Sequence, residues 1–200
     1  MQVKVTVWAL PFLLAAAATL GGCAEAVLGA GAATGVAIAQ ERSVGDAVDD
    51  AGIVVRVNAE LLRADEQLFS RAEVKSVEGR VVLTGTVPRP EQRIEASRIA
   101  WSVSGVRQVD NEIQVVDKTS VVDYAKDSWI TTRLRSKILA DSKVADINYT
   151  VETVNGVIYL IGIARSQSEL DRVIDYARNI GGVIKVVSHV RVKDAEAPRA

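Results

Sequence analysis

The sequence is short of the residues on which most catalytic and metal sites depend. Its 200 residues include one cysteine, Cys23, and one histidine, His189. A single thiol excludes an internal disulfide and a cluster of cysteine ligands, and a lone histidine makes a histidine-based metal or catalytic site hard to build. The chain also has no glycine-rich phosphate loop and no metal-ligand spacing. We therefore expect a protein that is not an enzyme and binds no metal.

Aromatic residues are also scarce, at 4% of the chain, whereas hydrophobic residues make up 48% and charged residues 24%. This composition is typical of a folded protein whose core is built mainly from valine, isoleucine, leucine and alanine. A chain of this length has room for one or two domains. The net charge of -1 indicates no class of partner by itself.

The first 20 residues have the pattern of an export signal. Lys4 and the terminal amine give a weakly basic start, and residues 5–20 form an uncharged, mostly apolar run. Such a segment is removed from the mature protein and takes no part in its fold. The alternative is a transmembrane anchor, since about 18 apolar residues are enough to cross a bilayer.

The next residues favour export. Residues 20–23, Leu-Gly-Gly-Cys, resemble the lipobox of bacterial lipoproteins, in which an aliphatic residue and two small residues precede the lipidated cysteine. The resemblance implies that residues 1–22 are a signal peptide and that Cys23 carries a diacylglycerol and an N-linked acyl chain such as palmitate, enough for stable anchoring. Lipoproteins that have no aspartate directly after the lipidated cysteine usually go to the outer membrane. The residue at this position is Ala24, so the resemblance implies that the protein is anchored on the periplasmic side of the outer membrane.

Residues 23–45 comprise this cysteine and a tether that is rich in alanine and glycine and nearly free of charge. Gly29, Gly31 and Gly35 argue against a stable helix, because glycine is unfavourable in helix interiors. A segment of this composition suits a flexible link between the anchor and the folded part.

The rest of the chain is an internal repeat with a period of 77 residues and no gaps, which indicates duplication of one small domain. Identical pairs include Asp50 and Asp127, Arg56 and Arg133, Gly79 and Gly156, Leu83 and Leu160, and Gly85 and Gly162. We place the two copies at residues 46–116 and 123–193.

Each copy predicts the order helix, strand, strand, helix, strand. In the second copy Ile130, Leu134 and Ile138 lie four apart on one helical face, residues 147–151 alternate as a strand, and Asn155-Gly156 predicts a hairpin turn. Residues 157–161 are a continuous apolar strand ending at Gly162. A capping box at residues 166–169 opens the second helix, and residues 183–192 form the last strand. Glu78-Gly79 and Pro90 are the corresponding turn and helix start in the first copy.

This order and its glycines resemble the BON domain. The residues that carry the resemblance are Gly79, Leu83-Thr84-Gly85 and Ser104-Gly105-Val106, with Gly156, Leu160-Ile161-Gly162 and Gly182-Val183. The resemblance implies an α+β fold of two tandem αββαβ domains, each a three-stranded mixed sheet packed against two helices. A lipobox followed by two such domains is similar to the dual-BON outer-membrane lipoproteins, which bind anionic phospholipids and support envelope integrity and are not known as catalysts.

The two copies differ in charge. Residues 46–117 contain 9 lysines and arginines and 13 aspartates and glutamates, a net of -4, whereas residues 118–194 contain 12 and 9, a net of +3. Only the second copy suits an anionic surface. Ordinary surface variation is the alternative explanation.

Trp129 is a second feature that distinguishes the second copy from the first. At about 100° per residue it lies about 140° from Leu134, the centre of the apolar helical face, and so points away from the core. Arg133 and Lys137 lie about 40° and 80° from it. An indole favours the bilayer interface, and basic residues are attracted to anionic headgroups. With the resemblance, which implies a phospholipid surface on this helix, the candidate site is Trp129, Thr132, Arg133 and Lys137. The alternative is that Trp129 covers a domain edge or the linker.

Other residues carry structural expectations. Trp101 and Ile94 lie opposite the inner face of their helix, so we expect this patch to pack against the second domain or, alternatively, a protein partner. His189 is expected to face solvent from the last strand. The acidic residues at positions 49, 50, 65 and 66 are expected to be solvated.

The sequence therefore predicts a periplasm-facing outer-membrane lipoprotein. It would bind anionic phospholipid, with phosphatidylglycerol and cardiolipin as expected ligands, through its second domain. The alternative is a protein–protein adaptor that tethers an envelope or cell-wall assembly through the acidic first domain and Trp101. We expect no cofactor beyond the acyl chains on Cys23, and no nucleic-acid partner.

Overall fold

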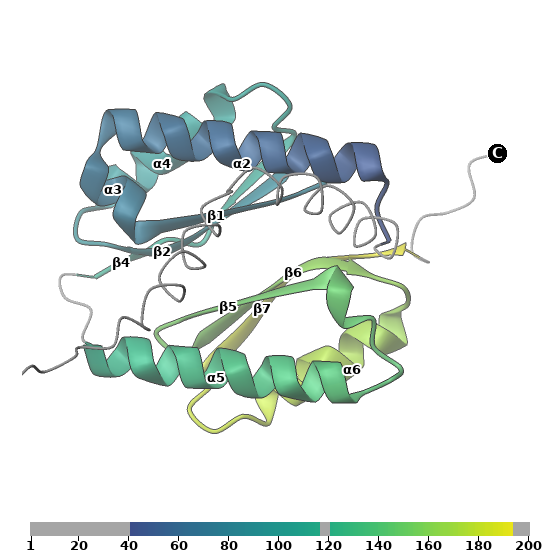
Figure 1. Ribbon diagram of the computed structural model, residues 1–200. Coiled ribbons are helices and arrows are strands. Elements are labelled where there is room, and N and C mark those ends of the chain that lie inside the picture. The colour runs from purple at the N-terminus through teal and green to yellow at the C-terminus, as the bar shows by residue number, and fades with distance from the viewer. Residues whose placement is uncertain (1–40, 117–120, 194–200) are drawn as a thin grey trace, which may run out of the picture. The chain divides into compact units, whose positions relative to one another are not determined.

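The computed structural model describes residues 41–116 and 121–193 (Figure 1). These residues all belong to one compact unit of the chain and form two separate hydrophobic cores, one in each repeat. The expected signal peptide, Cys23 and the tether as far as residue 40 lie outside the described residues.

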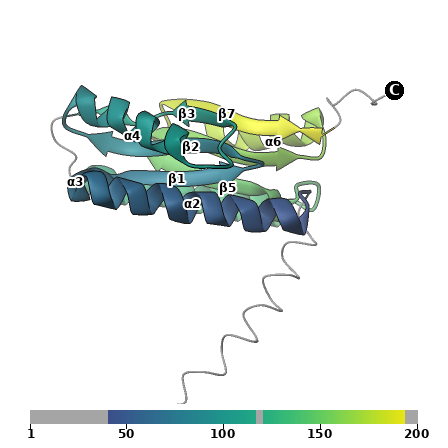
Figure 2. The same cartoon turned by 90° about the horizontal axis from the view of Figure 1, so that it is seen from above.

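The first domain packs helices on one face of a mixed sheet (Figure 1). Its elements are α2 (Val44–Ala64), α3 (Glu66–Arg71), β1 (Ala72–Val77), β2 (Arg80–Val87), α4 (Pro90–Ser102), β3 (Gln108–Asn111) and β4 (Gln114–Val115). The central strand β2 pairs antiparallel with β1 and parallel with both β3 and β4, which act as one interrupted strand. The long helix α2 contacts β1 along the sheet, as Figure 2 shows.

The second domain repeats this plan. Its elements are α5 (Val121–Ala140), η1 (Asp146–Asn148), β5 (Tyr149–Val154), β6 (Val157–Ala164), α6 (Gln167–Arg178) and β7 (Lys185–Val192). The sheet has the order β5-β6-β7, with the first pair antiparallel and the second parallel. The predicted α+β fold with mixed sheets is confirmed.

Several local predictions need correction. The short helix α3 was not expected; it begins because the Asp65 side chain accepts hydrogen bonds from the backbone of residues 67 and 68. Ile147 lies in the 3-10 turn η1, so the strand β5 begins only at Tyr149. The strand β6 does not end at Gly162 but continues to Ala164. Glycine is needed there because a Cβ would lie 1.9 Å from the carbonyl oxygen of Asn148.

The predicted capping box at residues 166–169 forms only in part. Ser166 accepts a hydrogen bond from the backbone N–H of Glu169 at 3.3 Å, which starts α6 as expected. The Glu169 carboxylate binds Arg165 at 2.6 Å and accepts a hydrogen bond from the backbone N–H of Ala145 at 3.4 Å. It therefore joins α6 to the loop after α5.

Both predicted hairpin turns are confirmed, and each is held by a buried aspartate from the first helix of its domain. Asp50 accepts hydrogen bonds from the backbone of Glu78 at 2.8 Å and Gly79 at 2.9 Å, and from the Ser76 hydroxyl at 2.7 Å. Asp127 repeats the two backbone contacts with residues 155 and 156. The expectation that Asp50 is solvated was wrong, because its carboxylate fixes α2 to the β1–β2 turn.

The two domains contact each other through the sheet faces that carry no helix. Val82 in β2 and Tyr159, Ile161 and Ile163 in β6 are buried although they belong to neither core. They lie on the central strands, which contact elements of the other domain. The central strand of each sheet is therefore covered on both faces.

The polar contacts around this apolar centre obey a pseudo-twofold symmetry. Two of them join repeat-equivalent residues 77 apart: Lys75 with Glu152 at 3.3 Å, and Glu112 with His189 at 3.1 Å. The two other contacts are equivalent to each other. Glu78 binds Arg191 at 2.7 Å, and the residues at the corresponding positions of the other repeat, Asn155 and Gln114, bind each other at 2.8 Å. This reciprocity is the pattern of an isologous dimer interface, here formed within one chain.

Two expectations fail at this contact. His189 points away from its own core, as predicted, but it meets Glu112 and Asp110 of the first domain, and its side chain is only 12% exposed. Trp101 does not dock the domains: it remains 55% exposed on α4. The contact is formed by the sheet faces, where Val82, Tyr159, Ile161 and Ile163 are buried.

Candidate functional site

The outer face of α5 carries the predicted site. Ile130, Leu134 and Ile138 are buried against the second core, which fixes the rotation of the helix. Trp129 consequently points outward and is 50% exposed. The orientation predicted from helical spacing is confirmed.

Trp129 and Arg133 form a pair on this face. The Arg133 guanidinium lies 5.6 Å from the centroid of the indole ring, within the range of a cation–π interaction. The two residues are one helical turn apart and both are exposed. The pair therefore presents an aromatic surface and a positive charge at the same point.

Lys137 lies on the same helix but has another neighbour. Its ammonium lies 5.7 Å from the ring centroid of Tyr176 in α6. The Tyr176 hydroxyl donates a hydrogen bond to Asp141 at 2.7 Å, and this bond lowers the pKa of that carboxyl below its usual range. Lys137 is thus held toward α6 and forms the basic edge of the site, apart from the indole.

Thr132 lies beside Trp129 and is exposed. Its hydroxyl donates a hydrogen bond to the carbonyl oxygen of Ser128 at 2.9 Å within the helix. This intrahelical bond satisfies its donor and leaves the oxygen able to accept. All four predicted residues share the outer face of α5, although only Trp129 and Arg133 contact one another.

Sequence reasoning missed two residues of this face. Lys126 is exposed on the basic side, about 60° from Trp129 on the helical wheel, and Leu139 is exposed on the opposite side, about 80° away. The same wheel that placed Trp129 predicts both. The face is therefore amphipathic across its width, with cations on one side and an aliphatic side chain on the other.

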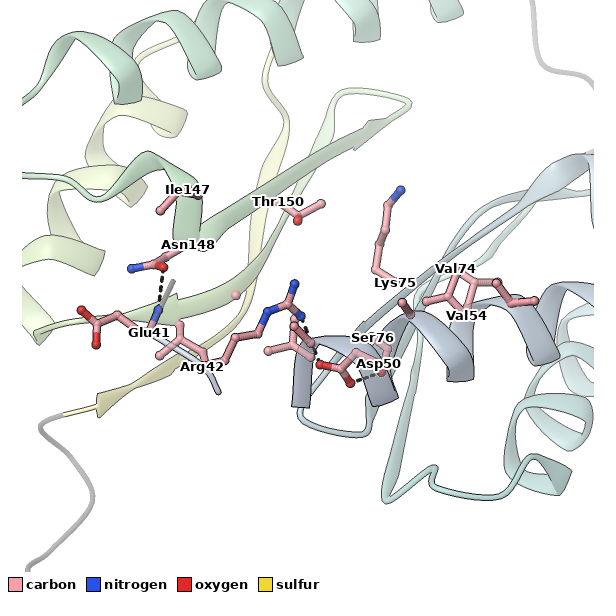
Figure 3. A pocket seen from close by; sticks show the side chains of 16 residues that line it. Glu41, Arg42, Asp50, Val54, Val74, Lys75, Ser76, Ile147, Asn148 and Thr150 are labelled. Atoms are coloured by element: carbon pink, nitrogen blue, oxygen red, sulfur yellow. Dashed lines mark hydrogen bonds and ion pairs between the residues drawn. The ribbon is translucent and has the colours of Figure 1, made fainter. Parts of the chain in front are cut away.

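Two grooves flank the domain contact, and the pseudo-twofold symmetry relates them. The α2 groove, about 430 Å³ in volume, runs between α2 and the start of β5, and Figure 3 shows its lining. The α5 groove, about 490 Å³, lies between α5 and the start of β1.

Their equivalent residues differ in chemistry. Apolar residues of the α2 groove match hydroxyl residues of the α5 groove in the pairs Ala51 and Ser128, Val54 and Thr131, Val55 and Thr132, Ile147 and Ser70, and Ile163 and Thr86. The fold therefore creates each groove without dictating its lining.

Within residues 41–116 and 121–193, no three histidine, cysteine, aspartate or glutamate side chains are grouped so that they could hold a metal ion. Over the same part of the chain, no helix has the length and apolar character needed to span a bilayer.

Comparison with known proteins finds the same domain in both repeats. The family model for the BON domain matches residues 49–117 and again residues 126–194. The chain is 41% identical over 153 residues to an uncharacterised protein from the gshII 5′ region of Anaplasma centrale, covering 76% of this chain and 100% of that one.

Two relatives carry more informative names. The chain is 34% identical over 187 residues to the outer membrane lipoprotein DolP of Haemophilus influenzae, covering 92% of this chain and 96% of that protein. It is also 34% identical over 152 residues to the osmotically-inducible protein Y of Escherichia coli, covering 75% and 76% respectively.

Proposed function

Because the chain belongs to the BON-domain family, we propose that it is a lipid-anchored outer-membrane protein that binds anionic phospholipid through the outer face of α5. The proposal includes acylation of Cys23, a periplasmic location, and a role in envelope integrity. Phosphatidylglycerol and cardiolipin are the proposed ligands, and no catalytic step is involved.

The exposed Trp129–Arg133 pair is the observation that carries this proposal. An indole partitions to the boundary between headgroups and acyl chains. A basic residue near an anionic membrane surface contributes about 1 kcal/mol. Both groups project from one rigid helix, so they would meet the membrane together.

The surroundings of the pair support the same orientation. Lys126 and Lys137 are exposed on its basic side, and Leu139 on its apolar side. The first domain carries the opposite net charge, so the second domain would face the lipid. The similarity to an outer membrane lipoprotein over most of both chains supports an acyl anchor at Cys23. An anchored chain would hold α5 near the membrane at high effective concentration.

A fragment of residues 41–200 makes the lipid contact measurable without the anchor. Both hydrophobic cores lie after residue 52, so the fragment contains each of them in full. Starting at residue 41 also keeps the ion pair between Arg42 and Asp50 at 3.1 Å. We therefore expect it to fold by itself, which a cooperative thermal transition checks.

Co-sedimentation of this fragment with vesicles tests the proposal. It should bind vesicles that contain phosphatidylglycerol or cardiolipin, not pure phosphatidylcholine, and less at high salt because salt screens exposed charges. Arg133→Ala should weaken binding about fivefold, the equivalent of 1 kcal/mol. Trp129→Glu should abolish it.

Trp101 supplies a matched control. It is a tryptophan on another helix with similar exposure, so Trp101→Glu should leave vesicle binding unchanged. Equal losses in Trp129→Glu and Trp101→Glu would refute a site on α5. A folded fragment that binds none of these vesicles would refute lipid binding altogether.

The second candidate function is a protein–protein adaptor, and the exposed patch of Trp101 and Ile94 on α4 favours it. Neither residue takes part in the domain contact, so the patch is open to a partner. Cross-linking in envelopes with a photoreactive group at residue 101 tests this function. Capture of one envelope protein, lost in Ile94→Asp, would support it, and no specific product would contradict it.

A further inference from the structure

The α5 groove is lined by hydroxyl side chains from both domains. They belong to Ser70, Thr84 and Thr86 of the first domain and to Tyr124, Ser128, Thr131, Thr132 and Thr153 of the second. The fold does not require them, because the equivalent positions of the α2 groove are mostly apolar. A ligand site is typically a concave surface with a few convergent polar groups. The polar lining therefore points to a polar ligand.

Thr84 is the buried member of this set. Its neighbour Leu83 belongs to the first core, so the alternation along β2 turns Thr84 to the opposite face of the sheet, toward the groove. Thr84 is 1% exposed, and its hydroxyl oxygen has no hydrogen-bond partner among the described residues. A buried hydroxyl without a partner is costly, and the equivalent residue of the second domain is Ile161. The groove therefore offers a hydrogen bond that this part of the chain does not use.

Several of the other hydroxyls remain able to accept. Thr132 and Ser70 each donate to a backbone carbonyl oxygen of their own helix, at 2.9 Å and 3.0 Å. Thr131 and Thr153 share one hydrogen bond at 2.7 Å. A hydroxyl oxygen has two lone pairs, so each of these groups can accept a further bond. Ligand hydroxyl groups fit this set, because they donate to such oxygens and can also accept from Thr84.

The charges at the groove are of both signs. Glu73 and Glu152 share Lys75, at 3.6 Å and 3.3 Å. The Asp127 carboxylate is bound to the backbone of its turn, and the exposed Arg71 adds a positive charge at the rim. Because most of these charges are balanced locally, the groove favours a neutral ligand over a phosphate or a metal ion.

Tyr124 gives the groove an aromatic surface. Its side chain is 72% exposed and lines the groove, whereas the equivalent residue of the α2 groove is Ala47. The ring offers a flat apolar face for the C–H groups of a sugar, and its hydroxyl adds a polar group. The groove volume of about 490 Å³ lies within the range of small-molecule sites, about 300–1,000 Å³.

From this combination we propose that the α5 groove binds a neutral sugar, through hydrogen bonds to its hydroxyl groups and stacking on Tyr124. The buried Thr84 binds the sugar hydroxyl that reaches the floor of the groove. Tyr124 lies about 140° from Trp129 around α5, so the sugar site is separate from the Trp129–Arg133 pair, with Thr132 at the border. In the proposed periplasmic location, a sugar unit of an envelope glycan has this chemistry.

NMR titration of the isotope-labelled fragment of residues 41–200 tests the site. The probes are maltotriose, cellotriose and triacetylchitotriose, which are neutral and rich in hydroxyl groups. At least one of them should cause saturable shifts of the backbone amides that surround the groove, in residues 70–73, 84–86, 124–132 and 152–155. The amides around the α2 groove should not shift, because its lining is mostly apolar.

Two variants test the residues that carry the proposal. Thr84→Val removes the buried hydroxyl at nearly constant volume, and it should weaken sugar binding about fivefold, the value of one neutral hydrogen bond. It should leave Tm unchanged or raise it, because the hydroxyl has no partner among the described residues. Tyr124→Ala should weaken binding by a similar factor through the lost stacking surface. Thr150→Val is the matched control: it removes a hydroxyl that lines the α2 groove, as Figure 3 shows, and should not change sugar binding.

The absence of saturable shifts with all three sugars would overturn the proposal. Shifts confined to other parts of the fragment, or equal affinities of the unmodified, Thr84→Val and Tyr124→Ala fragments, would overturn it as well. If water alone satisfies the Thr84 hydroxyl, Thr84→Val changes only the stability and the sugars shift no amide. These variants leave Trp129 and Arg133 in place, so the titration and the vesicle assay can fail separately.

Discussion

Replacement of the buried Asp50 by asparagine should destabilise the first domain far more than the same change next to it. The carboxylate accepts two backbone hydrogen bonds from the turn at residues 78 and 79 and one from the Ser76 hydroxyl. Arg42 contributes an ion pair at 3.1 Å. Together these contacts join α2 to the β1–β2 hairpin.

The magnitude follows from the acceptors that remain. An asparagine offers one oxygen where aspartate offers two, and its amide nitrogen would face the N–H of residue 78 or 79, donor against donor. A hydrogen bond to a charged group contributes about 1.5–3 kcal/mol, and leaving a buried donor unsatisfied costs about 1–3 kcal/mol. We expect Asp50→Asn to lower the free energy of unfolding by about 2–3 kcal/mol. For a domain of this size that corresponds to a fall in Tm of about 10 °C or more.

Urea and thermal unfolding of the fragment of residues 41–200 measure the loss, and hydrogen exchange locates it. The amides of Glu78 and Gly79 should lose protection first, because they donate to Asp50. Asp49→Asn is the control: this neighbour is exposed, so its effect should stay within about 0.5 kcal/mol. Equal stabilities of the Asp50→Asn and Asp49→Asn variants would refute the role of the carboxylate in fixing the turn.

Two further predictions concern the domain contact and the second sheet. Arg191→Glu should separate the domains, because it sets two carboxylates together in place of the ion pair with Glu78, and adding Glu78→Arg should restore the domain contact. Small-angle scattering would show a larger radius of gyration for Arg191→Glu and a normal radius for the double variant. An unchanged radius in Arg191→Glu would contradict the contact. Gly162→Ala should destabilise the second domain by about 1–3 kcal/mol in urea unfolding, because the added Cβ would lie 1.9 Å from the Asn148 carbonyl oxygen. Gly181→Ala should be nearly neutral, because no atom lies within 4 Å of its added Cβ. Similar losses of stability in both variants would contradict this reasoning.

The sequence by itself determined the repeat, the element order and the outward direction of Trp129. These features depend on local spacing. A hairpin turn needs residues that accept a positive φ, as at positions 78–79 and 155–156. A helix facing a core needs apolar residues every three or four positions, as in Ile130, Leu134 and Ile138.

The sequence also contains a signal for the domain contact, which the sequence analysis missed. The strand β6 is apolar at nearly every position from Val157 to Ala164, and such a run is typical of a strand covered on both faces. It predicts that something packs on the side of the sheet away from the helices. Tyr159, Ile161 and Ile163 are the residues buried on that side.

Only the tertiary structure decided which surfaces meet. We expected Trp101 at the domain contact from the sequence, but the sheet faces form it. The periodicity of apolar residues reports burial and does not identify the neighbour. The partners of His189 and Asp50 lie 77 and 28 residues away in the chain. Their burial depends on the packing of distant segments, and this is why a solvated position was the wrong expectation for both.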